Sequence, residues 1–282
     1  MSARAFLMNV AVVSTIMAVA ALIEAGVPMF ARTSRIPGRR AANLGLTVVV
    51  FLLNWSLSSA AAILALAVSL QPADFAMRLG VPMAIQIVAG IVVLDFSAGY
   101  LAHRALHLFP ILWRFHRVHH SDEFVDATTT YRTHPVETVW RFLFVILPVW
   151  TLGIPAQAVV IQRLVSAANG ILEHANIRLW APLDRVVSLV WVTPNVHKIH
   201  HSRQLSETNS NYGNVLTIYD RLLGTFTPSD RAESVIYGLD EADPTRIASF
   251  RGLVAMPFQH DRQRFLTQKS GSGRESLDNI PT

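Results

Sequence analysis

Three long apolar stretches open the sequence, and they limit its possible folds more than any other feature. They cover residues 6–30, 44–70 and 81–101, and each reaches the roughly 20 residues that a helix needs to span a bilayer. Only 15% of all residues are charged, whereas soluble domains carry roughly 25%. The first stretch is too long for the apolar part of a signal peptide and contains Glu24. We therefore predict an integral membrane protein.

A fourth apolar region covers residues 139–172 and is interrupted by Gly153, Ile154 and Pro155. Glycine and proline close together mark a turn. At 1.5 Å per residue, arms of about 14 and 17 residues are slightly short for full spans. We expect a helical hairpin that enters the membrane and leaves it on the same side.

The distribution of arginines predicts the orientation in the membrane. Between the first two apolar stretches lie four of them: Arg32, Arg35, Arg39 and Arg40. The opposite connection, residues 71–78, holds one Arg and one Asp. Positive loops stay in the cytoplasm, so the N-terminus is expected outside, and the third helix should return the chain to the cytoplasm near residue 102.

The chain is thus expected to divide into three parts. Residues 1–102 form transmembrane helices, and residues 103–260 form a catalytic region that includes the hairpin. Residues 261–282 form a polar, Gly/Ser-rich tail that we expect to be disordered. Because no segment is rich in strand signals, the predicted class is an all-α membrane protein, with about four transmembrane or hairpin helices and a cytosolic helical cap.

Histidines are concentrated in the second part of the chain. Ten of the eleven lie between residues 103 and 201. Eight of them form an H-x-x-x-H box and two H-x-x-H-H boxes: His103 and His107, then His116, His119 and His120, then His197, His200 and His201. His134 and His174 lie between the second and third boxes, whereas His260 stands alone and is interpreted as structural.

The spacing of the boxes indicates metal binding. Positions three and four apart on a helix share a face, so the first histidine of each H-x-x-H-H box is expected to face the same site as both members of the following pair. Eight or nine converging imidazoles can hold two divalent metals. Imidazole suits iron, zinc, copper and nickel, and the absence of cysteine excludes a thiolate zinc site.

These boxes resemble those of the fatty acid hydroxylase and sterol desaturase superfamily of membrane di-iron enzymes. The resemblance extends from about Asp95 to Thr225 and includes "HPVE" after the second box, and "NYG" and "DRLLGTF" after the third. It implies a four-helix membrane stem, a cytosolic helical cap, and two irons between them. The implied ligands are the eight histidines of the boxes, with His174 as a ninth. His134 matches a family position that is not always histidine.

Acidic residues near the boxes are candidates to orient the ligating imidazoles, since a metal-bound histidine usually donates its other N–H to a carboxylate or carbonyl. The candidates are Asp95, Asp122, Glu137, Glu173 and Asp220. Asp95 lies about 12 Å from His103 at helical rise, so a direct bond between them is not expected. For Asp220 and Gly224 the alternative is a turn that holds the cap together.

The resemblance implies an oxygenase that uses O2 to hydroxylate, desaturate or cleave an ether bond of a lipid such as a sterol, fatty acyl chain or alkylglycerol. The sequence does not choose among these reactions. No cytochrome b5 segment is present, so a separate electron-transfer protein is expected to supply electrons. The alternatives are a histidine-rich metal transporter and a zinc-dependent lipid hydrolase. The net charge of +5 comes mostly from arginines beside apolar runs, which favours lipid headgroups over nucleic acid.

Overall fold

The computed structural model describes residues 3–31, 36–69, 80–240 and 242–259. Four of its helices are long and apolar enough to cross a membrane: Phe6–Gly26, Arg39–Ala60, Met83–Leu108 and Pro135–Leu152. They belong to α1 (Ala3–Gly26), α2 (Arg39–Ser69), the helix that begins with α4, and α7 (Pro135–Leu152). With four helices of this kind, the chain is an integral membrane protein. Arg32, Arg35, the connection 71–78, His260 and the predicted tail lie outside the described residues.

The third spanning helix changes its winding on the way to the first histidine box. It runs through α4 (Met83–Leu94), a π-helical segment (Asp95–Leu101) and α5 (Ala102–Leu108) without a break. π-helical turns occur mostly as short insertions and often at functional sites. A Cβ at Gly99 would lie 2.9 Å from Asp95 Oδ1, so this turn packs closely only because residue 99 is glycine.

The interrupted apolar region forms two helices, α7 and α8 (Ala156–His174), joined at Gly153. Gly153 adopts the left-handed conformation with φ of 65°, which glycine reaches without a steric penalty. Each helix is longer than the sequence indicated, because α7 begins at Pro135 and α8 continues to His174.

An apolar core joins α4, α7 and α8. It includes Leu94, Val145, Val149, Ile154 and Ala158. Gly90 of α4 brings the first and last of these helices together, since a Cβ there would lie 2.7 Å from Ile154 Cγ2 and 2.9 Å from Ala158 Cβ. This core fixes the direction in which the C-terminal end of α8 points.

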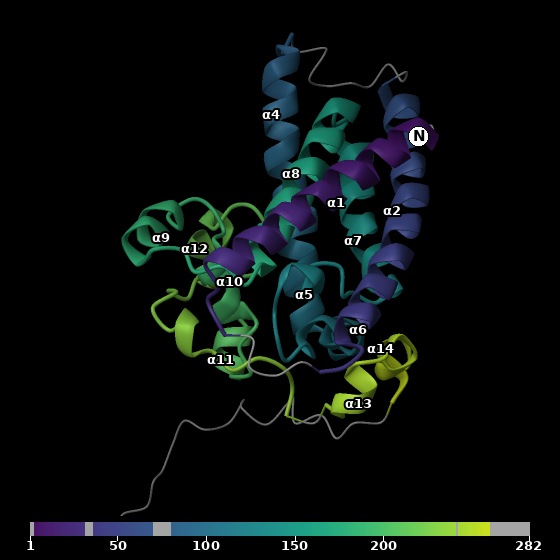
Figure 1. The fold of residues 1–282 in the computed structure, drawn as a ribbon. Helices are drawn as coiled ribbons and strands as arrows, with labels where there is room; N and C mark the ends of the chain where they lie inside the picture. The colour runs from purple at the N-terminus through teal and green to yellow at the C-terminus, as the bar shows by residue number, and fades with distance from the viewer. Residues whose placement is uncertain (1–2, 32–35, 70–79, 241, 260–282) are drawn as a thin grey trace, which may run out of the picture.

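Short helices form a cap at one end of the stem (Figure 1). The cap and its connections comprise α6 (Pro110–His120), α9 (Ala181–Val187), α10 (Pro194–His200), α11 (Leu205–Thr208), α12 (Ile218–Leu222), α13 (Pro244–Ile247) and α14 (Phe250–Ala255). Within the described ranges, extended pairing is limited to two isolated bridges, Pro28 with Ile177 and Trp191 with Leu216. The predicted all-α membrane fold is confirmed.

A buried polar network attaches α2 to the segment after α6. Arg39 donates to Asp122 Oδ2 at 2.7 Å and also pairs with Asp126. Arg132, fully buried, donates to Asn43 Oδ1 at 2.7 Å. Removing one partner of such a buried pair is costly because it leaves an uncompensated charge. The network therefore fixes the second histidine box against the start of α2.

Candidate metal centre

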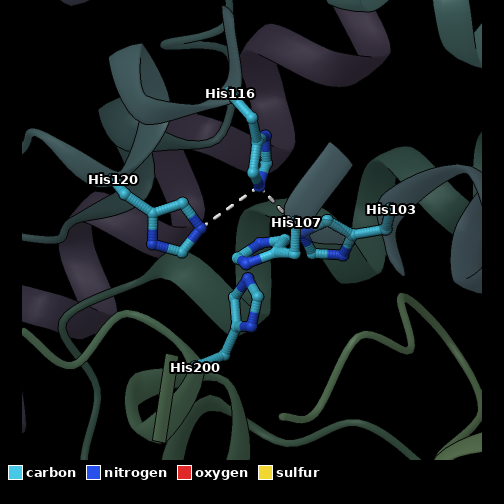
Figure 2. A group of neighbouring side chains, drawn as sticks. All are labelled: His103, His107, His116, His120 and His200. Atoms are coloured by element: carbon cyan, nitrogen blue, oxygen red, sulfur yellow. Dashed lines mark hydrogen bonds between the residues drawn. The ribbon is translucent and has the colours of Figure 1, made fainter. Parts of the chain in front are cut away.

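The nine histidines implied as ligands come together in two groups. Each residue of a group offers a nitrogen, and these nitrogens lie within 4.8 Å of one another. The first group has five members: His103, His107, His116, His120 and His200. The second group has four: His119, His174, His197 and His201. Figure 2 shows the rings of the first group, from α5, α6 and α10, pointing toward a common centre.

Each H-x-x-H-H box contributes to both groups, which corrects the expectation that its first histidine shares one site with both members of the pair. In α6, His116 and His120 face the first group and His119 faces the second. The third box divides the opposite way, because His197 and His201 face the second group and His200 the first. Positions three and four along a helix differ by about 100° in direction, so the members of the pair diverge.

In several rings, the outer nitrogen, which points away from the centre of its group, is held by a protein oxygen atom. The inner nitrogen is the one that points toward that centre. Nδ1 of His103 lies 2.8 Å from the Tyr212 carbonyl, and Nδ1 of His200 lies 2.7 Å from the Ser210 carbonyl. Nδ1 of His174 lies 2.6 Å from the Gly170 carbonyl. A carbonyl can only accept, so each of these Nδ1 atoms carries the proton, and Nε2 carries the lone pair in the neutral ring.

The inner nitrogens then face one another, and no proton lies between His103 and His116, because both of these rings carry their proton on Nδ1. His116 Nε2 lies 3.1 Å from the Nε2 atoms of both His103 and His120. His174 Nε2 lies 3.0 Å from the Nε2 atoms of His119 and His197. Lone pairs this close repel each other, whereas nitrogens bound at about 2.1 Å to one metal lie roughly 3.0–3.4 Å apart. Both groups therefore fit a bound cation.

Burial keeps the rings neutral. It lowers the pKa of His119 to about 3 and that of His200 to about 4. The pKa values of His116, His197 and His201 also lie well below the ordinary value, first because of burial and then because of neighbouring basic groups. A metal requires neutral imidazole, so protons compete weakly for these nitrogens.

Two of the five candidate carboxylates lie directly beside the histidines. Glu137 accepts from His116 Nδ1 at 2.9 Å and from Arg141 Nε at 2.9 Å. An oxygen of Glu173 lies 3.8 Å from His174 Nδ1 and 3.9 Å from His197 Nε2, which is beyond hydrogen-bond distance. Glu137 is thus the carboxylate placed to orient an imidazole.

The other three carboxylates accept hydrogen bonds from side chains or backbone N–H groups around the site. Asp122 accepts from Arg39, Asn43 and Thr129. Asp220 accepts from the backbone N–H groups of Tyr212 and Gly213, at 2.9 and 2.8 Å. Asp95 accepts from the backbone N–H of Leu216 at 3.2 Å. Asp220 therefore acts on the site indirectly, by holding the loop whose Tyr212 carbonyl fixes His103.

His134 lies outside both groups. It precedes α7, and its Nδ1 accepts from the backbone N–H of Val136 at 3.2 Å. Its ring packs against Phe115 and Phe258. The structure thus gives this histidine a helix-capping position.

Sequence reasoning missed several groups around the histidines. Asn209 Oδ1 lies 3.3 Å from His107 Nδ1. Lys198 is fully buried, and its ammonium donates to the carbonyl of His174. The carbonyls of Gly170, Ser210 and Tyr212 belong to the backbone, so residue identity does not predict their role. The only sequence signal for these groups was the pair of stretches "NYG" and "DRLLGTF". Asp220 of the second stretch accepts hydrogen bonds from the backbone of Tyr212 and Gly213 in the first.

A cavity of about 220 Å³ connects the histidines to the membrane stem. Its wall includes His103, His119, His174 and His197 at one end. Farther along the stem the wall includes Gln162 and Arg163 of α8. A substrate in this cavity would lie beside both histidine groups.

Fold and site together define a helical membrane protein with two buried groups of histidines, each of which fits a metal ion. Residues 87–225 match the fatty acid hydroxylase family. This region, which carries all nine clustered histidines, belongs to that family.

Three relatives show which proteins the chain is similar to. An ornithine lipid hydroxylase from Rhizobium tropici is 36% identical over 190 residues, covering 67% of this chain and 55% of the relative. The alkylglycerol monooxygenase of Homo sapiens is 30% identical over 143 residues, covering 50% and 30%. A fatty acid hydroxylase from Lecanicillium sp is 29% identical over 159 residues, covering 51% and 41%.

The chain thus spans about half the length of the first of these relatives and less of the others. No solved structure matches the chain.

Proposed function

We propose that this protein is a membrane-bound di-iron oxygenase that oxidises a C–H bond of a lipid. The observation that carries the proposal is the pair of adjacent histidine groups, five and four rings, whose inward-facing nitrogens lie 3.0–3.2 Å apart. Nine imidazoles exceed what one zinc needs, because catalytic zinc sites keep three protein ligands and an open position.

The first group would hold one iron and the second group the other. When bound, two irons supply the reduction of O2 and the oxidation of an unactivated C–H bond, which no side chain performs. For hydroxylation the balance is R–H plus O2, two electrons and two protons, giving R–OH and water. A separate electron-transfer protein would supply the two electrons. Hydroxylation, ether cleavage and desaturation share this oxidant and differ in how the lipid is placed.

The protein's own task is to hold the rings and exclude water. Carbonyls of Gly170, Ser210 and Tyr212 fix three tautomers, and the Glu137 carboxylate fixes that of His116. Arg141 in turn holds Glu137. Because the cavity reaches into the helical stem, a lipid would arrive from the bilayer without crossing water. We assign the catalytic role to 103–260 and the role of membrane anchor to 1–102.

The histidines would lie on the cytoplasmic side. Arg39 and Arg40 stand at the start of α2, and Arg39 bonds Asp122, two residues after the second box. The second box therefore lies at the same end of α2 as its basic residues. Such residues favour the cytoplasm.

Lipidomics of membranes with and without the protein tests the proposal. We expect a lipid whose mass changes by one oxygen, by two hydrogens or by loss of an ether-linked chain, and we expect the change to vanish with His119→Ala. The matched control is His134→Asn, which removes a buried histidine outside both groups and keeps a good helix cap. If the change persists in His119→Ala, or no lipid changes, the proposal fails.

Metal analysis of the purified protein separates the alternatives. Two irons per chain, with lipid oxidation that requires O2 and a reductant, support the oxygenase. Zinc with lipid headgroup release independent of O2 would instead indicate a hydrolase. Metal flux through vesicles that contain the protein would indicate a transporter.

A further inference from the structure

Two cavities meet at one polar wall within the stem. The first is the histidine-lined cavity, and the second, of about 290 Å³, lies among α1, α2 and α8. The second is largely apolar, with Phe6, Val13, Phe51 and Val159 in its lining. Four residues line both cavities: Asn54, Tyr131, Arg163 and Ala167.

Arg163 is the charged group of this shared wall. It donates from Nη2 to Asn54 Oδ1 at 2.8 Å. It forms no ion pair with any residue in the described part of the chain. By contrast, Arg141 pairs with Glu137 in the same first cavity. A cation in an apolar helical hairpin is costly unless an opposite charge meets it, so Arg163 is placed for an anion that the described protein does not provide.

Asn54 can complete such a site. Its carbonyl oxygen is occupied by Arg163, and within the described residues its amide nitrogen has no hydrogen-bond partner. Guanidinium binds carboxylate or phosphate through two parallel hydrogen bonds, and an amide N–H can add a third.

We propose that Arg163 and Asn54 bind the anionic group of the lipid substrate, a carboxylate or a phosphate, while an apolar chain of that lipid fills the second cavity. The inference rests on the proposed lipid oxidation for the substrate's identity. The rest of the lipid then extends through the first cavity toward the histidines. The apolar wall on one side and the lone cation between the cavities match an amphiphile in this orientation.

The position of Arg163 also determines which part of the lipid reaches the metals. Arg163 precedes His174 by eleven residues on α8, a distance of roughly 16 Å along the helix axis. Arg163 is thus a positioning residue, because anchoring the anion sets the length of lipid between the anion and the reacting carbon.

Binding of two matched amphiphiles tests the proposal. Iron-loaded protein in maltoside detergent at pH 8 is titrated with dodecyl phosphate or dodecanol, without O2 or reductant, and occupancy is read by native mass spectrometry. We expect the wild-type protein to bind dodecyl phosphate at least about tenfold more tightly than dodecanol, because a charge-assisted pair of hydrogen bonds adds this much affinity. Inorganic phosphate alone should not compete at equal concentration, which distinguishes a lipid anion from free phosphate.

Two variants should abolish the preference by different routes. Arg163→Gln removes the cation, and Asn54→Asp keeps it but supplies a carboxylate beside it. Arg163→Lys should restore part of the preference. The control Arg178→Gln, which breaks an exposed pair with Glu233, should leave it unchanged. Each variant is compared only after iron content and monodispersity match the wild-type protein.

The proposal is overturned if the wild-type protein shows no preference for dodecyl phosphate. It is also overturned if folded Arg163→Gln or Asn54→Asp protein keeps that preference. Because no turnover is involved, this result is separate from the proposed function. A failed preference with intact lipid oxidation rejects the role of Arg163 alone. A preference without lipid oxidation would reject the oxygenase and keep the anion site.

Discussion

At the scale of single residues, the site depends on what holds the nitrogen that faces away from the metal. Three rings use backbone carbonyls, and His116 uses the Glu137 carboxylate at 2.9 Å. A carboxylate makes the ring a better donor to the metal than a carbonyl does, because its negative charge stabilises the proton on Nδ1. Glu137 is therefore the side chain outside the histidines whose loss should matter most.

Glu137→Ala should lower iron retention or lipid oxidation by about 10–100-fold, the usual effect of losing such a partner. Glu137→Gln should lose less, because its amide oxygen still accepts from His116. Iron per chain after a fixed dialysis against chelator measures the effect. The control is Glu233→Ala, whose side chain is 61% exposed. Equal iron retention in Glu137→Ala and the wild-type protein would contradict this role.

At the scale of elements, the site depends on close approach between helices. α8 ends in His174, and its direction is set by packing against α4 at Gly90. The third spanning helix carries His103 and His107 at its far end, beyond the π-helical segment. Small shifts between these helices would therefore separate the two histidine groups.

Gly90→Ala should destabilise the protein by about 1–3 kcal/mol, the usual cost of overpacking. The added Cβ would lie 2.7 Å from Ile154 Cγ2 and 2.9 Å from Ala158 Cβ. Gly26→Ala is the matched control, since a Cβ there meets nothing within 4 Å. Thermal unfolding in detergent compares the two. The double variant Gly90→Ala/Ala158→Gly should recover part of the loss, and a Gly90→Ala protein as stable as Gly26→Ala would refute the packing argument.

At the scale of the whole molecule, the two histidine groups connect parts of the chain that are distant in sequence. The first group joins α5 and α6 to α10, and the second joins α6 to α8 and α10. A metal held by each group would therefore tie the stem to the cap. Without the metals, the lone pairs of His103 Nε2 and His116 Nε2 face each other at 3.1 Å.

Metal removal should lower the unfolding temperature and loosen the cap. A ligand that binds only the native state stabilises it by RT ln(1 + [L]/Kd), about 4 kcal/mol at a thousandfold excess over Kd. Limited proteolysis before and after chelation should show new cleavage between 175 and 215 in the metal-free protein. Identical digestion patterns in both states would argue against a structural contribution from the metals.

Acid should destabilise the metal-free protein well above the range where carboxylates titrate. The pKa of His200 is about 4 in the folded protein and about 6.5 when unfolded. The unfolded chain therefore binds more protons between these values, and stability falls as pH drops below about 6.5. Each histidine that must gain a proton costs up to about 1.4 kcal/mol per pH unit. An unfolding temperature that stays constant from pH 8 to pH 5 would contradict this.

The sequence by itself determined the features that depend on neighbours along the chain. Apolar stretches of membrane length, the break at Gly153, and the three histidine boxes are all readable because helix periodicity and turn chemistry act over a few residues. The resemblance to the fatty acid hydroxylase family followed from the same local patterns. The clustered set of nine histidines was implied in full, and His134 was set apart from them.

Only the tertiary structure decided how these features meet. The division of each H-x-x-H-H box between two groups depends on where α5, α8 and α10 lie around α6. Residue identity does not show that the carbonyls of Gly170, Ser210 and Tyr212 hold histidines, because every residue has a backbone carbonyl. The contact of Arg163 with Asn54 joins positions 109 residues apart. Such contacts follow from packing over the whole chain, which no local pattern encodes.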